Sequence, residues 1–267
     1  MYVFLDTERS GAVATIWMNR PQQHNAFNAV MIAELTDAFT RLGVDESVRI
    51  VILAGRGKSF SAGADLDWMK SAGEGGFDDN LTDAYKLAQM FRSLAEMPKP
   101  TLARIQGAAI GGGMGLAAAC DICIASDEAK FATSEVKFGI IPSVISPYVL
   151  RAIGSRQASR YFLTAETMSA VTAQQIGLVH ERVQSSALDT RISEIVGNLT
   201  NGGPHAQAAA KMLIRDVAGK AMSDTLLQET AQSIASLRMQ KEAREGLRAF
   251  LEKRSPVWIC EAGSDDV

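Results

Sequence analysis

Residues 59–66, SFSAGADL, and residues 109–116, AIGGGMGL, are the two stretches that decide the fold of this chain. Each follows an apolar, strand-like run and leads into a helical pattern, with glycines at the junction. Glycine permits unusual dihedral angles and lets another backbone or a ligand approach closely. The first turn of a helix leaves N–H groups without partners and carries partial positive charge. A simple turn explains either stretch alone, whereas two such helix starts that converge on one oxygen atom form an oxyanion hole.

Outside these two stretches, apolar strand patterns alternate with helical ones. The apolar runs predict strands at 14–18, 50–54, 101–105 and 122–125. Helical spacing predicts a helix over 31–42 with Gly43 as its C-cap, and a second over 79–95. Residues 71–79 are polar and rich in glycine, and we expect a mobile loop there. Buried strands that alternate with helices favour an α/β fold with parallel strand pairing.

The C-terminal part of the chain has a different pattern. After about Ile145 the sequence is almost wholly helical, with one late strand expected at 178–181. Polar and apolar residues then recur at the 3.6-residue period to the end of the chain. The sequence therefore predicts a core over 1–200 and a helical region over 201–267.

Composition excludes several classes of protein. The 267 residues are 47% hydrophobic, which is enough for one sizeable core, and the net charge is -3. Scattered basic residues argue against a nucleic-acid partner. The longest apolar runs fall short of the ~20 residues of a membrane-spanning helix. The first five residues enter a strand pattern directly, without a leader, so we expect a cytoplasmic protein that acts away from membranes.

Neither the cysteines nor the histidines predict a metal site. Cys120 and Cys123 have CxxC spacing, but their surroundings are apolar and no second pair follows at finger spacing. We interpret them as small buried hydrophobic residues in a reducing compartment. The histidines have no partners at ligand spacing; they are His24, His180 and His205.

Three familiar site motifs are also missing from the sequence. Gly57-Lys58-Ser59 has the ending of a Walker A loop, but Ile52 stands where its first glycine belongs. The glycines at 111–113 follow a strand without completing GxGxxG. A GxSxG nucleophile elbow is absent, so the sequence does not support a serine hydrolase.

Several stretches, in order along nearly the whole chain, resemble one known family. They are NRP at 19–21, HNAFN at 24–28, VILAGRGKSFSAGADL at 51–66, QGAAIGGG at 106–113, ACDI at 119–122, FGIIP at 138–142 and EGLRAFLEKR at 245–254. Together they are similar to the enoyl-CoA hydratase/isomerase (crotonase) superfamily. The resemblance implies an α/β fold, a crotonase-like spiral of ββα repeats with a C-terminal helical trimerisation region, in a homotrimer or a dimer of trimers.

The resemblance also implies where an acyl-coenzyme A substrate would bind. The thioester oxygen would lie between the N–H groups of Ala64 and Gly112. The remaining positions would contact the substrate, with the last two near the nucleotide and able to come from a neighbouring subunit: Ala26, Ala62, Asp65, Leu66, Gly111, Phe250 and Lys253. No metal and no other cofactor is implied, because the oxyanion hole stabilises a thioester enolate and acid/base chemistry does the rest.

One position departs from the pattern of the standard hydratases. These use two glutamates, one three residues past the oxyanion-hole glycine and the other twenty residues further on. The matching positions here are Gly115 and Glu135, so only the second carboxylate is present. We expect Glu135 to be the general acid/base, in an apolar pocket that raises its pKa; otherwise it is an ordinary surface glutamate.

The leading prediction is a lyase that adds water across a 2-enoyl-CoA. Residues 136–149, VKFGIIPSVISPYV, resemble the bacterial methylglutaconyl-CoA and isohexenylglutaconyl-CoA hydratase branch, which favours a branched or glutaconyl-type acyl chain. A single glutamate is also what Δ3,Δ2-enoyl-CoA isomerases use. A third alternative is a non-catalytic acyl-CoA-binding homologue. The sequence leaves the acyl chain, the pathway and the choice between trimer and hexamer open.

Overall fold

A six-stranded sheet runs through the core of the protein in the order β1-β2-β3-β4-β6-β9. The computed structural model describes residues 1–260, apart from the side chains of Ala72 and Cys260. The strands are β1 (Leu5–Ser10), β2 (Val13–Met18), β3 (Ile50–Gly55), β4 (Thr101–Ile105), β6 (Ile122–Ser126) and β9 (Glu181–Val183). From β2 to β9 the pairing is parallel, as predicted, while β1 closes one edge as an antiparallel hairpin.

A second, smaller sheet lies beside the first in the order β5-β7-β8. Its strands are β5 (Ala108–Ile110), β7 (Lys130–Ala132) and β8 (Met168–Ser169). Two isolated parallel bridges, Ser61 with Ala109 and Phe27 with Ala64, continue this sheet beyond β5. The stretch around residues 61–64 is therefore a rudimentary strand of the second sheet.

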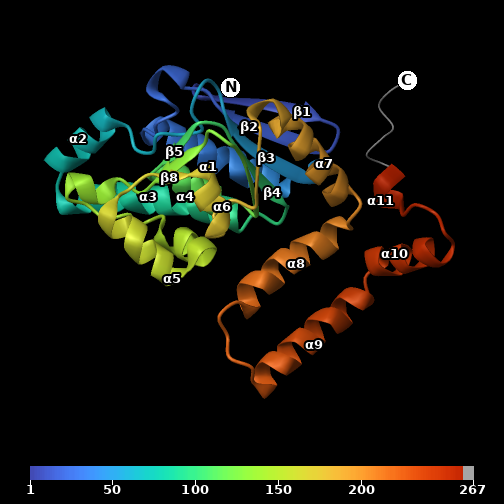
Figure 1. Cartoon of the computed structure of the whole chain (residues 1–267). Coiled ribbons are helices and arrows are strands. Elements are labelled where there is room, and N and C mark those ends of the chain that lie inside the picture. The colour runs from blue at the N-terminus through green and yellow to red at the C-terminus, as the bar shows by residue number, and fades with distance from the viewer. Residues whose placement is uncertain (261–267) are drawn as a thin grey trace.

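Helices connect the strands and cover the sheets (Figure 1). The α-helices are α1 (Ala29–Val44), α2 (Leu66–Glu74), α3 (Phe77–Ala95), α4 (Gly112–Ala119), α5 (Ser146–Thr164), α6 (Ala170–Gln175), α7 (Leu188–Thr200), α8 (Pro204–Val217), α9 (Asp224–Arg238), α10 (Lys241–Leu251) and α11 (Val257–Cys260). Short 3-10 helices are η1 (Pro21–Gln23), η2 (Glu135–Phe138) and η3 (Ser185–Ala187).

The chain follows a spiral in which each turn visits both sheets. It passes from β3 to residues 61–64 and α2, from β4 to β5 and α4, and from β6 to β7 and η2. Successive turns stack in parallel register within each sheet. The predicted fold class, a crotonase-like spiral of ββα repeats, is confirmed.

Both faces of the large sheet are buried, which explains why its strands are apolar throughout. Ile50 and Ile52 of β3 belong to a cluster with Leu188 and Ile192 of α7. Val51 and Leu53, on the opposite face of the same strand, belong to the main core with α1, α3 and α4. Alternate residues of a strand point to opposite faces, so one apolar run serves both layers.

Three local predictions are wrong. Gly43 lies inside α1, whose C-cap is Asp45. Most of residues 71–79 is helical, because α2 extends to Glu74 and α3 begins at Phe77. The strand expected at 178–181 begins only at Glu181; Leu178 and Val179 are buried, but their amides bond to the Ala173 carbonyl at the end of α6.

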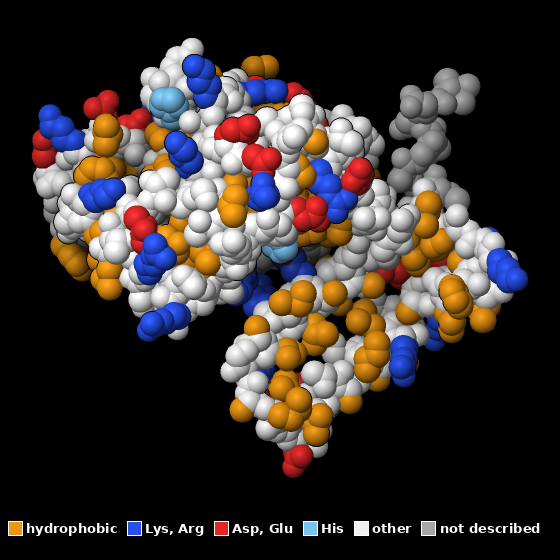
Figure 2. Space-filling view, viewed as in Figure 1, with side chains coloured by type: hydrophobic (Ala, Val, Ile, Leu, Met, Phe, Trp, Pro, Cys, Tyr) orange, Lys and Arg blue, Asp and Glu red, His pale blue; other side chains and the backbone are white. Residues whose placement is uncertain are grey.

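Helices α8, α9 and α10 extend away from the spiral as an arm (Figure 1). Figure 2 shows hydrophobic side chains gathered over this arm. The exposed ones include Met212, Leu213, Ile214, Leu227, Ile234, Leu247 and Phe250. The arm begins after α7 ends at Thr200; the last residues of the predicted helical region, 261–267, lie outside the described residues. Within residues 1–260 no helix is long and apolar enough to cross a membrane.

Candidate active site

The register of the small sheet brings three distant segments to one place. Ser61 pairs with Ala109, and Ala109 pairs with Phe131 in the next turn. Ala64 lies three residues past the first of these positions and Gly112 three residues past the second. Glu135 lies four residues past the third. The predicted donors and the predicted acid/base group therefore occupy equivalent places in consecutive turns of the spiral.

The two glycine-bearing stretches touch each other. A Cβ atom placed on Gly63 would stand 2.7 Å from the carbonyl oxygen of Ile110 and 3.2 Å from the amide nitrogen of Gly112. The backbone of Gly63 also has a φ of +85°, which a side chain disfavours. Glycine at this position allows the backbone next to Ala64 to approach the start of α4.

The amides of Ala64 and Gly112 are free of internal acceptors. Phe27 donates to the Gly63 carbonyl at 2.6 Å and accepts from the Asp65 amide at 2.8 Å, so the Ala64 N–H is directed away from Phe27. Gly112 is the first residue of α4, where the N–H has no intrahelical partner. Across residues 1–260 neither amide donates a hydrogen bond, and both residues are half-buried between buried neighbours. The two predicted donors thus lie in adjacent turns of the spiral without internal acceptors, and their convergence on one ligand oxygen stays a prediction.

Glu135, the first residue of η2, lies in the next turn and stands against Gly111, the residue before Gly112. A Cβ atom on Gly111 would lie 3.0 Å from Glu135 Oε1. The other carboxylate oxygen, Oε2, is buried without a hydrogen-bond partner. Burial raises the pKa of the Glu135 carboxyl, with only a weak opposing effect from a backbone hydrogen bond. These features distinguish Glu135 from a solvated surface glutamate, and its role as the general acid/base stays a prediction.

Asp65 holds the first glycine stretch against the helix that follows it. Its Oδ1 accepts from the amides of Asp67 and Trp68 at 3.0 and 3.2 Å, so it caps α2. Its Oδ2 accepts from the Arg20 guanidinium at 2.9 Å in a largely buried ion pair. Burial alone would raise the pKa of Asp65, but the Trp68 amide and the Arg20 charge together lower it. Asp65 is an ionised structural anchor, and residues 1–260 contain no group of three or more His, Cys, Asp or Glu side chains placed to hold a metal.

Asn25 organises the same region, although the sequence pattern assigned it no role of its own. Its side-chain amide donates to the carbonyls of Arg56, Ser59 and Phe60 at 2.9, 2.9 and 3.1 Å. Its Oδ1 accepts from the Arg20 amide at 2.9 Å, and the residue is fully buried with a φ of +55°. His24 and Asn25 both have positive φ. The only sequence signal for such a hub is the residue type, because asparagine and histidine adopt positive φ more readily than most residues.

Replacing Asn25 by alanine is expected to lower the free energy of unfolding by about 3 kcal/mol. Buried carbonyls left without donors cost about 1–3 kcal/mol, and alanine is strained at positive φ. Urea unfolding followed by circular dichroism measures the change. Asn198, exposed on α7, provides the control, since Asn198→Ala should fall within about 0.5 kcal/mol of the parent. Equal effects of the two substitutions would contradict the hub role.

The other predicted contact residues differ in which backbone groups are already hydrogen-bonded within the protein and in how exposed they are. The Ala26 carbonyl accepts from Arg20 at 2.7 Å, and the Ala62 amide donates to the His24 carbonyl at 2.9 Å. The Gly111 amide donates to the Ala132 carbonyl at 2.8 Å. Leu66, the first residue of α2, is exposed. Their contact with a substrate stays a prediction.

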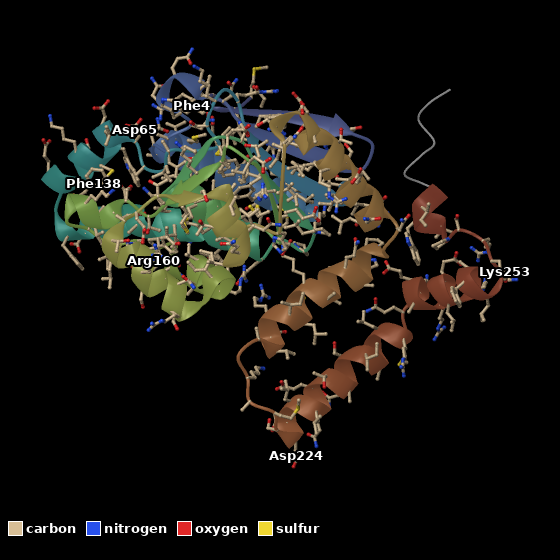
Figure 3. The ribbon with its side chains drawn as sticks, in the orientation of Figure 1. Phe4, Asp65, Phe138, Arg160, Asp224 and Lys253 are labelled. Carbon is tan, nitrogen blue, oxygen red and sulfur yellow. The ribbon has the colours of Figure 1, made fainter. Side chains whose placement is uncertain are left out.

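Phe250 and Lys253 are not brought to this site within one chain. Phe250 lies in α10 and is 80% exposed. Figure 3 shows Lys253 at the far end of the C-terminal arm, well away from Asp65 and Phe138 on the opposite side of the molecule. Any contact of these two residues with a substrate at Glu135 therefore requires a neighbouring subunit.

Two further features lie apart from the three segments. Burial raises the pKa of the Cys123 thiol to about 12, and Cys120 is buried beside it with a raised pKa, as expected for packing residues.

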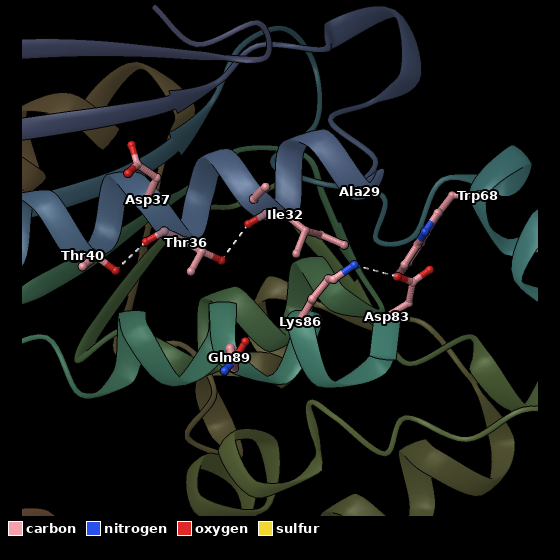
Figure 4. A pocket seen from close by; sticks show the side chains of 10 residues that line it. Ala29, Ile32, Thr36, Asp37, Thr40, Trp68, Asp83, Lys86 and Gln89 are labelled. Atoms are coloured by element: carbon pink, nitrogen blue, oxygen red, sulfur yellow. Dashed lines mark hydrogen bonds and ion pairs between the residues drawn. The ribbon is translucent and has the colours of Figure 1, made fainter. Parts of the chain in front are cut away.

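A cavity of about 410 Å³ runs between α1 and α3 (Figure 4). Its lining is Ala29, Ile32, Ala33, Thr36, Asp37, Thr40, Trp68, Asp83, Lys86 and Gln89, which includes none of the three predicted catalytic positions.

Comparison with known proteins decides the family. Residues 8–260 match the family model described as enoyl-CoA hydratase/isomerase. The chain belongs to this family. The predicted resemblance and the prediction of a hydratase-type enzyme are confirmed at this level, whereas the suggested likeness to the methylglutaconyl-CoA branch stays a prediction.

Relatives in this family cover nearly the whole chain. A crystal structure of an enoyl-CoA hydratase from Shewanella pealeana is 41% identical, with a TM-score of 0.93 over 96% of both chains. An enoyl-CoA hydratase/isomerase from Marinobacter aquaeolei is 34% identical, with a TM-score of 0.90 over 96% of this chain and 99% of its own. The 4-chlorobenzoyl coenzyme A dehalogenase-2 of an Arthrobacter species is 34% identical over 87% of this chain and 85% of its own length. Hydratase-type proteins and a dehalogenase thus share this fold.

Proposed function

We propose that this family member adds water across the double bond of a 2-enoyl-CoA. The observation that carries the proposal is Glu135, whose Oε2 is buried without a partner and whose Oε1 stands against Gly111, in the turn that follows the free amides of Ala64 and Gly112. An anion-stabilising pair of donors next to a single basic group is what enolate chemistry on a thioester requires.

In the proposed reaction, Glu135 takes a proton from water while the water oxygen bonds to C3 of the acyl chain. The electrons of the C2–C3 double bond move onto the thioester oxygen, where the Ala64 and Gly112 N–H groups hold the enolate. C2 then takes up a proton as the enolate returns to a thioester, and a 3-hydroxyacyl-CoA results. Protonated Glu135 can return the same proton, so water, enzyme and product balance without a further cofactor.

The preferred acyl chain is proposed to be branched, with a 3-methylglutaconyl-type chain as the first candidate. The support is the likeness of residues 136–149 to that branch of the family. The substrate's own carboxylate, or a bound water, would then assist the protonation of C2 that Gly115 leaves without a second side chain.

Loss of the enone thioester absorbance tests the reaction directly. Crotonyl-CoA, 3-methylcrotonyl-CoA and 3-methylglutaconyl-CoA would be compared, with products identified by mass. Hydration that is fastest for the branched dicarboxylic substrate supports both the reaction and the substrate class. Hydration of crotonyl-CoA alone supports the reaction and overturns the substrate class.

A second candidate is a Δ3,Δ2-enoyl-CoA isomerase, favoured by the single carboxylate at the site. Glu135 would remove a proton from C2 of a 3-enoyl-CoA and return it to C4. A 3-enoyl-CoA added to the same panel separates the two enzymes, because isomerisation forms a 2-enoyl-CoA of unchanged mass. Tight binding of the thioesters with no turnover of any of them would instead indicate a non-catalytic acyl-CoA-binding protein.

We also propose that the arm formed by α8, α9 and α10 assembles the chain into a homotrimer or a dimer of trimers in the cytoplasm. The exposed apolar side chains of the arm lie together, whereas the apolar residues on the surface of a monomeric protein are usually scattered singly. In such an assembly Phe250 and Lys253 would reach the nucleotide of the substrate bound by a neighbouring subunit.

Light scattering is expected to give a mass of three or six times the 28.6 kDa of the chain. Leu227→Glu with Ile234→Glu on α9 should dissociate the assembly, because burying a charge in an apolar interface is unfavourable. Leu163→Glu, at an exposed leucine on α5, provides the control. A chain that remains monomeric and fully active at high concentration would contradict the assembly.

A further inference from the structure

We infer that Ile145 restricts this site to one carboxylate, because its side chain fills the space beside Gly115. The inference rests on the proposed acid/base function of Glu135. It concerns the position at which the sequence departs from the two-glutamate pattern, and it explains why that position is glycine.

Gly115 lies one helical turn from the site. Its amide donates to the Gly111 carbonyl at 3.0 Å, so the two residues follow each other along α4, about 6 Å apart. The Glu135 carboxylate stands against Gly111. A side chain on Gly115 would therefore project from the turn that follows the one beside Glu135.

That space is already occupied by two core residues. A Cβ atom on Gly115 would lie 2.8 Å from Ile145 Cβ, closer still to Ile145 Cγ2, and 3.0 Å from Phe91 Cε1. Distances this short between carbon atoms are strongly repulsive, so even alanine requires Ile145 to move. Position 115 is glycine because Ile145 and Phe91 meet there.

Ile145 cannot easily give way. It is 3% exposed and precedes α5, where its carbonyl accepts from the amides of Tyr148 and Val149 at 3.1 Å each. Phe91 is fully buried in α3, with its ring centroid 5.7 Å from that of Tyr148. Phe91 of α3 and Ile145, directly before α5, thus occupy the place of a second carboxylate, and the packing of these two helices holds them there.

It follows that residues 115 and 145 act as a pair. A carboxylate at 115 would need a smaller residue at 145, whereas a smaller residue at 145 alone would leave a cavity. Replacing Gly115 by glutamate and Ile145 by a smaller residue should give a site with two carboxylates, whose pH dependence differs from that of the parent.

A double-mutant cycle of Gly115→Ala and Ile145→Ala tests the pairing without any need for activity. Gly115→Ala alone should lower the Tm by about 5 °C, since overpacking a core is destabilising in a domain of this size. In the double variant the Tm loss should be smaller than the sum of the two single losses. Val149→Ala, at a buried residue of α5, should give additive losses with Gly115→Ala.

A second experiment compares the activities of Gly115→Glu and Gly115→Glu/Ile145→Ala on the best enoyl-CoA. We expect the double variant to exceed the single variant at least ~10-fold in kcat and to show a second ionisation in its pH–rate profile. Additive Tm losses in the cycle, or a double variant no faster than Gly115→Glu, would overturn the role of Ile145. Failure of the parent to turn over any enoyl-CoA would overturn the proposed function instead, while the Tm cycle would still decide the pairing.

Discussion

Glu135→Gln is expected to lower kcat for the best enoyl-CoA substrate by about 10³-fold, with a much smaller change in KM. Glutamine has the shape of glutamate but cannot take a proton from water, and general acid/base groups contribute about 10²–10⁴-fold to rates. Glu135 is the carboxylate that borders Gly111. Steady-state kinetics on the parent and the variant measures the effect.

The pH dependence of the parent has a definite sign. Burial raises the pKa of Glu135, and the proposed base acts in its ionised form. The rate of hydration should therefore fall as the pH drops through this raised value, and the midpoint should lie above the 4.5 of an ordinary glutamate. In Glu135→Gln the residual rate should lack this step.

The same carboxylate should cost stability at neutral pH. Because its folded-state pKa is raised, the folded protein binds more protons than the unfolded chain between the ordinary and the raised value, and stability falls as the pH rises through that window. Glu135→Gln is thus expected to raise the Tm at pH 7 and to leave it unchanged well below pH 4.5.

Glu46 provides the matched control, since it is an exposed glutamate remote in sequence from the three segments. Glu46→Gln should alter neither kcat nor the pH profile. A Glu135→Gln variant that keeps more than about a tenth of the parent rate would remove Glu135 from the mechanism.

Gly112→Ala is expected to lower kcat by about 10²–10³-fold, the usual effect of losing one oxyanion-hole donor. A Cβ atom on Gly112 would lie 2.6 Å from Phe27 Cε2 and 3.1 Å from Phe27 Cδ2. Phe27 is buried and is bonded through its backbone to both neighbours of Ala64, so relief of this clash moves one or both donors. Rates on crotonyl-CoA and on the best substrate of the panel should fall together.

A glycine elsewhere in the protein separates this effect from a general response to alanine. Gly197 lies in α7, and a Cβ atom there would have no neighbour within 4 Å. Gly197→Ala should leave kcat unchanged and stabilise the protein slightly, because alanine favours the helix. If Gly112→Ala folds normally and retains the parent rate, its amide does not bind the thioester oxygen.

Much of the fold could be predicted because apolar periodicity is a strong signal. The run at 50–54 is buried on both faces, and the stripe of α1 (Met31, Leu35, Ala38, Phe39 and Leu42) is buried against the core. Residues 71–79 were misjudged because α2 and the start of α3 are exposed, so their helical state does not appear as an apolar stripe. Secondary structure is hard to predict from composition in exposed segments, because burial does not require apolar residues at a helical spacing there.

The candidate site could be predicted only in part. The glycine stretches and Glu135 carry a recognisable pattern, and the structure brings them together through strand register. The role of Ile145 has no such signal, because a buried isoleucine 30 residues from Gly115 in sequence resembles any other core residue. Lys253 lies far from Asp65 in the same chain, so its predicted contact with a substrate depends on assembly, which the fold of one chain does not test.

The stacking of the turns has a consequence for how this protein can vary in length. In the proposed site, each turn supplies one group through a few residues of its small-sheet strand and those that follow: 61–64, 109–112 and 131–135. A residue inserted in one of these spans would shift its group by about 3.3 Å and turn it toward the opposite face, while the other two stayed in place. The helical side of each turn lies outside this register. Insertions and deletions should therefore accumulate on that side and leave the three short spans constant in length.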